Sequence, residues 1–317
     1  MTSQQLPNDE PGVLKMAHQL SIWAKDGDPE KGIEHDTKFY TFSGQVPWAM
    51  PPCTEKITPD SAAEATDIPK PKVVLLRLLG PQDEQDHSFP HSCQRLLGFL
   101  KTEADIKTAF TAADALDFIT NDHPQAVIVT DPALTVRDTA SPCYKPAASI
   151  VLEKLKTYVA AGGRAIFCCY FTLAHPIDVG PFFKTHFNRS WVWLALHRAV
   201  VEYQPAALEN FPPNNYLKKY YNIKSCFLKG VDPSEALYKD PKTEDSRDDL
   251  TAAAYGKFGN GYIGWIGDDN KELLLDEAVF AMCGFTKLHP QLDKWYPDTS
   301  VRVDLTGAKV GGTQLSS

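Results

Sequence analysis

Runs of apolar residues alternate with helix-like segments through the middle of the chain. Continuous apolar runs at residues 73–79, 126–129 and 164–169 are typical of strands buried on both faces of a sheet. Before the last run, residues 149–161 carry apolar side chains at helical spacing, and the glycine pair at 162–163 provides the stop. This alternation indicates parallel strands joined by right-handed helical crossovers.

Beyond residue 176 the pattern predicts shorter elements. Residues 191–203 are aromatic and β-branched, which suits one bent strand or a hairpin. Residues 231–250 hold seven acidic and three basic residues, so a solvated excursion is expected there. A glycine-rich turn at 255–261 is typical of a hairpin, and Asp269 with Glu272 opens a last helix.

Proline content divides the chain into parts. Six prolines between residues 47 and 71 prevent a persistent helix or central strand, so residues 1–70 are predicted to be a proline-rich N-terminal extension. Residues 71–286 are predicted to form an α/β domain, followed by a C-terminal tail at 287–317. Within the extension, the apolar segment 39–48 is a candidate for docking on a surface or on another subunit, and disorder is the alternative.

Composition narrows the class of protein. Apolar residues make up 43% and charged residues 23%, close to the values of globular domains. The net charge of −8 has the wrong sign for neutralising phosphates, so nucleic acid is not expected as a partner. No apolar run reaches about 18 residues and no signal-peptide pattern is present, so we expect a soluble cytoplasmic protein without membrane contact.

The seven cysteines give no motif for a disulfide framework or a zinc site. No two of them are spaced as Cys-x-x-Cys, and their number is odd. We expect buried thiols in a reducing compartment, and neither a metal nor a cofactor.

The order of these elements, with the segment from Gly259 to Asp268 before the last helix, resembles the class I glutamine amidotransferase-like superfamily. Within it the chain is most similar to the trehalose-utilisation-like and uncharacterised groups. The resemblance covers residues 71–286 and concerns topology more than motifs. It implies an α/β fold, a flavodoxin-like three-layer sandwich with a mostly parallel central sheet.

The same resemblance raises a question about catalysis. Active class I members carry Gly-x-Cys-x-Gly after a central strand and a His-x-Glu pair further on. Here the corresponding strand ends in Cys168 and Cys169, but neither neighbour is glycine, which argues against a sharp nucleophile turn. No His-x-Glu pair follows, so we expect no glutaminase activity.

The carboxyl end of the 164–169 strand is nevertheless where a doubly wound sheet would place a ligand crevice. Cys169 is therefore a candidate nucleophile, and two buried packing thiols are the alternative. His175 and His197 are candidates for its general base. A solvated histidine is the alternative for each.

Three further residues are candidates for ligand binding at the same edge. Asp131 ends the neighbouring strand and could orient a base or bind a hydroxyl, or it could cap the next turn. Tyr170 and Phe171 could line an apolar cleft for a planar or sugar-like ligand, with core packing as the alternative.

Two other patterns are weaker. His87 and His91 lie four residues apart beside acidic residues, but Pro90 breaks the helical geometry that a metal site would need. The glycines at 256–267 precede a strand rather than a helix, so hairpin geometry explains them better than a phosphate cradle.

Three hypotheses about function follow. The first is a protein of the amidotransferase-like fold that binds a small molecule or a protein partner without glutaminase chemistry. The second is a cysteine-dependent hydrolase or transferase that uses Cys169 with a nearby histidine. The third is an assembly role for the 39–48 segment, which leaves a homo-oligomer open.

Overall fold

The computed structural model describes residues 69–80, 93–141, 144–209, 211, 216–241 and 249–286. Every described residue belongs to the unit Thr66–Ser317. The 39–48 segment, His87, His91 and the 287–317 tail lie outside the described residues, so the predictions about them stay predictions. None of the helices in the described ranges is long and apolar enough to cross a membrane.

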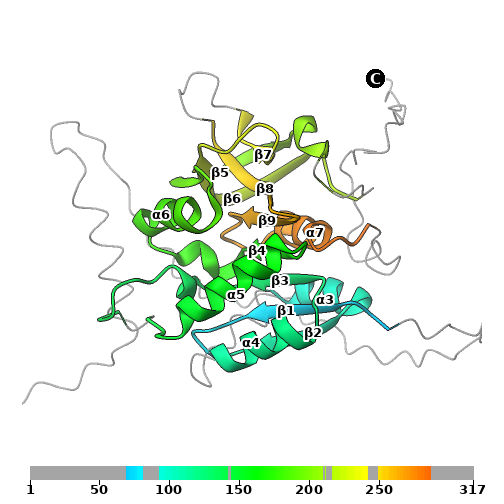
Figure 1. Cartoon of the computed structure of the whole chain (residues 1–317). Helices are drawn as coiled ribbons and strands as arrows, with labels where there is room; N and C mark the ends of the chain where they lie inside the picture. The colour runs from blue at the N-terminus through cyan, green and yellow to red at the C-terminus, as the bar shows by residue number, and fades with distance from the viewer. Residues whose placement is uncertain are drawn as a thin grey trace, which may run out of the picture. The chain divides into compact units, whose positions relative to one another are not determined.

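Parallel strands form one half of a nine-stranded sheet (Figure 1). Each pairs in parallel with its neighbour, and the strands expected at 126–129 and at 164–169 lie in the interior of this half. The strands at 72–76, 126–129 and 164–167 have only four or five residues each, because both faces of these strands carry buried apolar side chains. Across the sheet the order is β2 (Asp105–Ala109), β1 (Lys72–Leu76), β3 (Ala126–Val129), β4 (Arg164–Phe167) and β9 (Gly261–Ile266).

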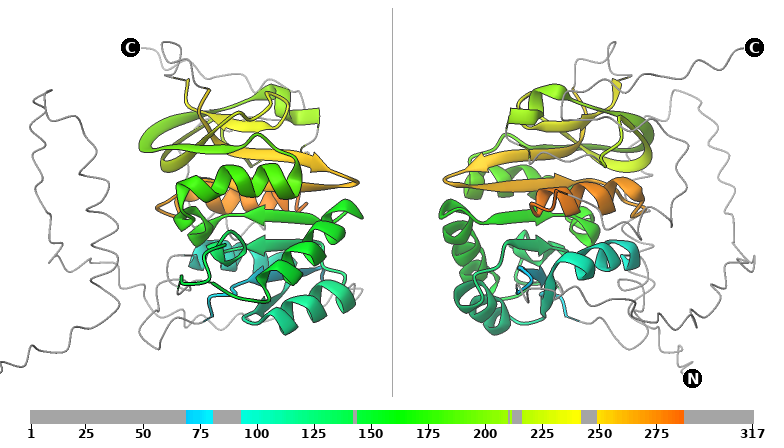
Figure 2. Two further views of the ribbon diagram at one scale, coloured as in Figure 1. Left: turned by 60° about the vertical axis from the view of Figure 1, so that its left-hand side comes forward. Right: turned by 90° about the vertical axis from the view of Figure 1, so that its right-hand side faces the viewer.

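Helices cover both faces of the parallel half (Figure 2). Alternate residues of each strand point to opposite faces, so Val73 and Leu75 contribute to one buried cluster and Val74 and Leu76 to another. On the first face lie α3 (Gln94–Glu103) and α7 (Leu273–Met282), and on the second lie α4 (Ala112–Asn121), α5 (Ala148–Ala160) and α6 (Pro176–Phe187).

The other strands are antiparallel and close into a small barrel. β6 pairs with β5, β5 with β7, β7 with β8, and β8 returns to β6. β8 also pairs with β9, which joins the barrel to the parallel half. A 3₁₀ turn, η3 (Pro205–Glu209), follows β5. The barrel strands are β5 (Val192–Tyr203), β6 (Tyr220–Lys229), β7 (Ala236–Lys239) and β8 (Thr251–Phe258).

The expected flavodoxin-like sandwich with a mostly parallel sheet is therefore wrong. Antiparallel pairings among these strands number five and parallel pairings four, and β5 to β8 form a closed ring instead of an open sheet. The expectation of a solvated excursion at 231–250 contributed to this error. Ala236, Leu237 and Tyr238 of β7 are fully buried there, and the acidic residues around them obscured so short a strand.

Two local predictions in the same region are confirmed. The aromatic 191–203 segment is a single strand with an irregularity between Trp193 and Ala195. The glycine-rich segment at 255–261 contains the turn of the β8–β9 hairpin, at Gly259 and Asn260, where Phe258 pairs with Gly261; residues 255–258 belong to β8.

Candidate functional site

Strand β4 ends in a tight bend. Cys168 extends the strand, since its N–H donates to Val129 O at 3.1 Å, and Cys169 follows with a φ of 57°. This left-handed backbone is uncommon for a residue other than glycine. The 3₁₀ turn η2 (Cys169–Leu173) begins here, and the Thr172 hydroxyl donates to Cys169 O at 2.8 Å. A sharp turn thus forms without the glycines that it was expected to need.

The Cys169 thiol at this bend is buried and not accessible to solvent. Cys168, Cys169 and the Cys93 residue ahead of α3 are all fully buried, and the Sγ atoms of Cys168 and Cys169 lie 3.6 Å apart. The contact with Cys168, together with burial, raises the pKa of Cys169 well above its ordinary value, although contact with Cys93 acts in the opposite sense. The group is therefore a neutral thiol at neutral pH, whereas a nucleophile requires the thiolate.

Neither candidate histidine accompanies this thiol. His175 is exposed at the N-cap of α6, where its Nδ1 accepts a hydrogen bond from Ile177 N at 3.4 Å. His197 lies on β5, which β9, β8 and β6 separate from β4. Its Nε2 lies 3.0 Å from Asp240 Oδ2, and its ring stacks on Phe227 with centroids 4.3 Å apart. The structure thus brings no Cys–His pair together from the predicted residues.

The Asp131 carboxylate accepts hydrogen bonds from two backbone N–H groups. Its Oδ1 accepts from Ala133 N at 3.0 Å and caps the 3₁₀ turn η1 (Pro132–Leu134), while Oδ2 accepts from Leu79 N at 3.0 Å. Burial raises the pKa of this carboxyl, and the two N–H donors lower it in part. The side chain connects the end of β3 to the segment after β1 and caps the next turn, as the alternative interpretation of Asp131 predicts.

Neither aromatic candidate lines the two pockets found among the described residues. Phe171 is fully buried in a cluster of rings, 4.9 Å from Phe167 and 6.0 Å from Trp265 between centroids. Tyr170 is half-buried, and the Lys271 ammonium lies 4.7 Å above its ring. Among the residues that the structure describes, no group of His, Cys, Asp or Glu is arranged to hold a metal ion.

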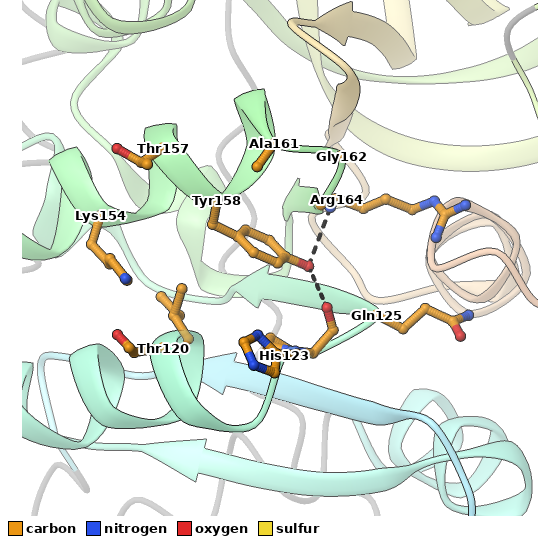
Figure 3. Close-up of a pocket in the computed structure, with 12 residues that line it drawn as sticks. Thr120, His123, Gln125, Lys154, Thr157, Tyr158, Ala161, Gly162 and Arg164 are labelled. Carbon is orange, nitrogen blue, oxygen red and sulfur yellow. Dashed lines mark hydrogen bonds between the residues drawn. The ribbon is translucent and has the colours of Figure 1, made fainter.

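A groove opens instead at the opposite edge of the sheet, between the last turns of α4 and α5 (Figure 3). Its volume is about 560 Å³, within the range of small-molecule sites. None of its lining residues is acidic. The lining residues are Ile119, Thr120, His123, Pro124, Gln125, Lys154, Thr157, Tyr158, Ala161, Gly162, Gly163 and Arg164.

Tyr158 lies at the floor of the groove and connects its two sides by hydrogen bonds. Its hydroxyl donates to Pro124 O at 2.9 Å and accepts from Arg164 N at 3.3 Å, so it links the turn after α4 to the turn after α5. The ring lies where a side chain on Gly163 would be, because a Cβ there would come within 2.2 Å of it. Burial raises the pKa of this phenol, which stays a hydrogen-bond donor at neutral pH.

Some polar groups that line the groove already have hydrogen-bond partners within the protein, and others point away from it. The Thr120 and Thr157 hydroxyls donate to the carbonyls of Leu116 and Glu153, four residues back in each helix. Figure 3 shows the Lys154 side chain directed from α5 toward α4, whereas the Gln125 and Arg164 side chains extend away. The Gln125 amide donates to Cys283 O at 2.7 Å.

His123 is the strained residue of the groove. It follows α4 with a φ of 49°, ahead of Pro124, so the helix stops in a left-handed residue that is not glycine. Such a backbone costs about 1–3 kcal/mol and tends to occur at functional sites. The imidazole lies at the rim of the groove, next to the C-terminal end of α4 (Figure 3).

Reasoning from the sequence did not identify these residues. Both helix ends, at His123-Pro124 and at Gly162-Gly163, can be predicted from the sequence. Doubly wound sheets bind ligands at the carboxyl ends of their strands, however, so the candidate residues were expected there. The order and direction of the strands would have indicated this groove. Since α4 leads into β3 and α5 into the adjacent parallel strand β4, the two helix–strand turns must lie side by side.

A second hollow of about 430 Å³ lies near the start of β5, lined in part by Ser190, Trp191 and Asp232. Its charged side chains already have polar partners, and Asp232 accepts from Ser234 N at 2.8 Å. Arg189 Nε lies 3.0 Å from Glu235 Oε1, and Trp191 Nε1 donates to Glu235 Oε2 at 3.1 Å. With its charges already paired, this hollow has less to offer a ligand than the α4–α5 groove.

Comparison with known proteins finds distant structural likenesses. No family model and no curated protein matches the chain. A ThuA-like protein from Bacteroides uniformis is 14% identical, and the match covers 72% of this chain and 93% of that one with a TM-score of 0.43. A cytoplasmic protein from Salmonella typhimurium is 11% identical over 69% of this chain and all of its own, with the same TM-score.

A β-galactosidase from Bacillus circulans is 14% identical over 68% of this chain but only 31% of its own, with a TM-score of 0.41. The match to the ThuA-like protein is distant, so the family resemblance of the sequence stays a prediction. These likenesses do not show what this chain binds.

Proposed function

We propose that this chain is a binding protein that holds a small molecule in the α4–α5 groove and performs no cysteine chemistry at the end of β4. The observation that carries the proposal is the composition of the groove. It combines an apolar floor with polar groups at its rim, and its lining includes no carboxylate or thiol. Such a lining can orient a ligand, and it offers neither a carboxylate nor a thiol as a nucleophile.

The floor suits a flat or aliphatic ligand body. The buried side chains of Ile119 and Pro124 and the half-buried ring of Tyr158 present apolar surface between the two helices. The Tyr158 hydroxyl and the carbonyls of Ala160 and Gly163 already have backbone partners. A ligand can therefore cover this floor without leaving buried polar groups unpaired.

A thermal-shift screen with a library of small organic compounds tests the proposal. Ala161→Trp fills the groove from an exposed position, and Ala113→Trp places the same side chain on an exposed part of α4 outside it. A ligand at 100 times its Kd adds about 2.7 kcal/mol to the free energy of unfolding. We expect compounds that stabilise the native chain and A113W but not A161W. If no compound shows this selective loss, the proposal fails.

A cysteine-dependent hydrolase or transferase is the second candidate, and the φ of 57° at Cys169 favours it. A left-handed residue after a central strand is the backbone of a nucleophile turn. Three observations oppose it: the thiol is fully buried, its pKa is raised, and both predicted histidines are engaged elsewhere. The absence of glutaminase activity is part of the leading proposal.

A further inference from the structure

We infer that the ligand of the α4–α5 groove is a small organic anion, an apolar body with a carboxylate or phosphate head placed between Lys154 and His123. This inference rests on the proposed function and names its ligand class. A molecule with a net charge of −8 would show acidic residues at an arbitrary surface hollow, yet this lining carries basic side chains and no acidic one.

The lysine is available to a ligand. Among the described residues, neither the Lys154 ammonium nor the His123 imidazole has a hydrogen bond or ion pair with another side chain. The positions three and four residues from Lys154 on α5 are Val151, Ile150, Thr157 and Tyr158, none of which is acidic. No intrahelical ion pair can therefore neutralise this ammonium.

The acidic residues nearest in sequence have other partners. Asp122, next to His123, lies 2.7 Å from Lys72 Nζ and 2.5 Å from Lys107 Nζ. Asp117 accepts from Asn121 Nδ2 at 2.6 Å, and Glu153 pairs with Lys156 at 2.9 Å. None of these carboxylates pairs with Lys154, so its ammonium keeps a positive potential that the partial negative charge at the C-terminal ends of α4 and α5 reduces only in part.

The geometry also fixes which part of the ligand is charged. The apolar floor lies deep between the helices, whereas Lys154 is half-buried and His123 is exposed at the rim. A ligand thus places its apolar body on Tyr158 and Ile119 and its head outward, where an ammonium and an imidazole N–H can both donate. Charge-assisted hydrogen bonds of this kind are roughly twice as strong as neutral ones.

Three probes of one shape test the charge: benzoate, benzamide and benzamidinium, titrated into the full chain and followed by NMR. We expect benzoate to bind about tenfold more tightly than benzamide and benzamidinium to bind most weakly. Lys154→Gln lowers the affinity for benzoate to that for benzamide and leaves benzamide unchanged. Lys156→Gln, on the same helix but outside the groove, is the matched control and changes neither.

His123→Asn completes the set, because asparagine tolerates the left-handed backbone and a loss of affinity then reports on the imidazole. Equal binding of benzoate and benzamide, or benzoate affinity unchanged in K154Q, overturns the anion inference. If benzamide binds the native chain but not A161W and charge has no effect, the inference fails while the proposed function stands. If none of the three binds at millimolar concentration, the inference also fails, and the compound screen decides the proposed function separately.

Discussion

At the scale of single residues, the most unusual feature is a set of carboxyls buried under α7. Asp268, Asp276 and Glu277 are each less than 5% exposed. Arg95 Nε lies 2.7 Å from Asp276 Oδ2, Tyr221 donates to Glu277, and Asp268 Oδ2 accepts from Leu275 N at 3.3 Å. Burial outweighs these partners and raises the pKa of Asp276 to about 8 and that of Asp268 to about 6.

This set predicts that stability falls as pH rises. The folded state holds protons that the unfolded chain, with carboxyl pKa values of about 4, releases, so unfolding becomes easier between about pH 4 and pH 8. One such proton changes the free energy of unfolding by at most about 1.4 kcal/mol per pH unit. Asp276→Asn should flatten the dependence between pH 6 and 8 in urea unfolding, whereas the exposed Asp117→Asn should not. An unchanged slope in D276N would show that Asp276 is ionised in the folded protein.

A second residue-scale prediction concerns the thiols at the end of β4. Because Cys168 and Cys169 are fully buried and their pKa values are raised, both should stay unlabelled by a thiol reagent at pH 7.5 in the native protein. Both should react at once in denaturant. Rapid labelling of Cys169 in the native chain would favour the cysteine-dependent enzyme.

Sequence reasoning at this scale identified positions better than roles. Asp131 and Cys169 do lie at strand ends, as the apolar runs predicted. Their surroundings depend on distant segments: Leu79 for the carboxyl, and Cys93 for the thiol. The left-handed backbone of Cys169 and His123 has no sequence signal, since neither residue is glycine.

At the scale of elements, close packing of α5 against β9 shapes the region next to the groove. Gly261 lies under the last turn of α5, where a Cβ would come within 2.1 Å of Gly163 O and 2.2 Å of Val159 O. Both contacts are with backbone, so a side chain can be accommodated only if the helix moves. The C-terminal end of α5, which carries Tyr158, is therefore packed directly against the β8–β9 hairpin.

Two glycine substitutions test this packing. Gly261→Ala should lower the free energy of unfolding by about 2 kcal/mol or more, because backbone atoms must shift. Gly98→Ala, inside α3 with no atom within 4 Å of its Cβ position, should raise it by about 0.5–1 kcal/mol through helix propensity. Urea unfolding measures both. Equal effects of the two substitutions would mean that α5 and β9 are not in contact as described.

Elements with a strong period were predictable, and short or edge strands were not. The buried runs of β3 and β4 and the amphipathic α5 follow from their apolar spacing. β2 has the sequence Asp-Ile-Lys-Thr-Ala with exposed Asp105 and Lys107, because an edge strand needs less apolar surface. β7 has four residues amid acidic ones, too few for a period to show.

At the scale of the whole molecule, the unrecognised strands changed the architecture. β6 and β7 close a barrel with β5 and β8, so half of the sheet is antiparallel. No local pattern predicts such closure, because it depends on pairing between segments far apart in the sequence. The same limit hid the groove, which exists only once β3 and β4 are adjacent and parallel.

The central claim is that a ligand binds between α4 and α5 and not at the end of β4. Amide chemical-shift mapping, during titration with the compound that stabilises the chain most in the thermal screen, tests it most directly. We expect the largest shifts at residues 119–125 and 154–164, and we expect them to disappear in A161W. Largest shifts at Cys93, Cys168, Cys169 and Tyr170, retained in A161W, would contradict it.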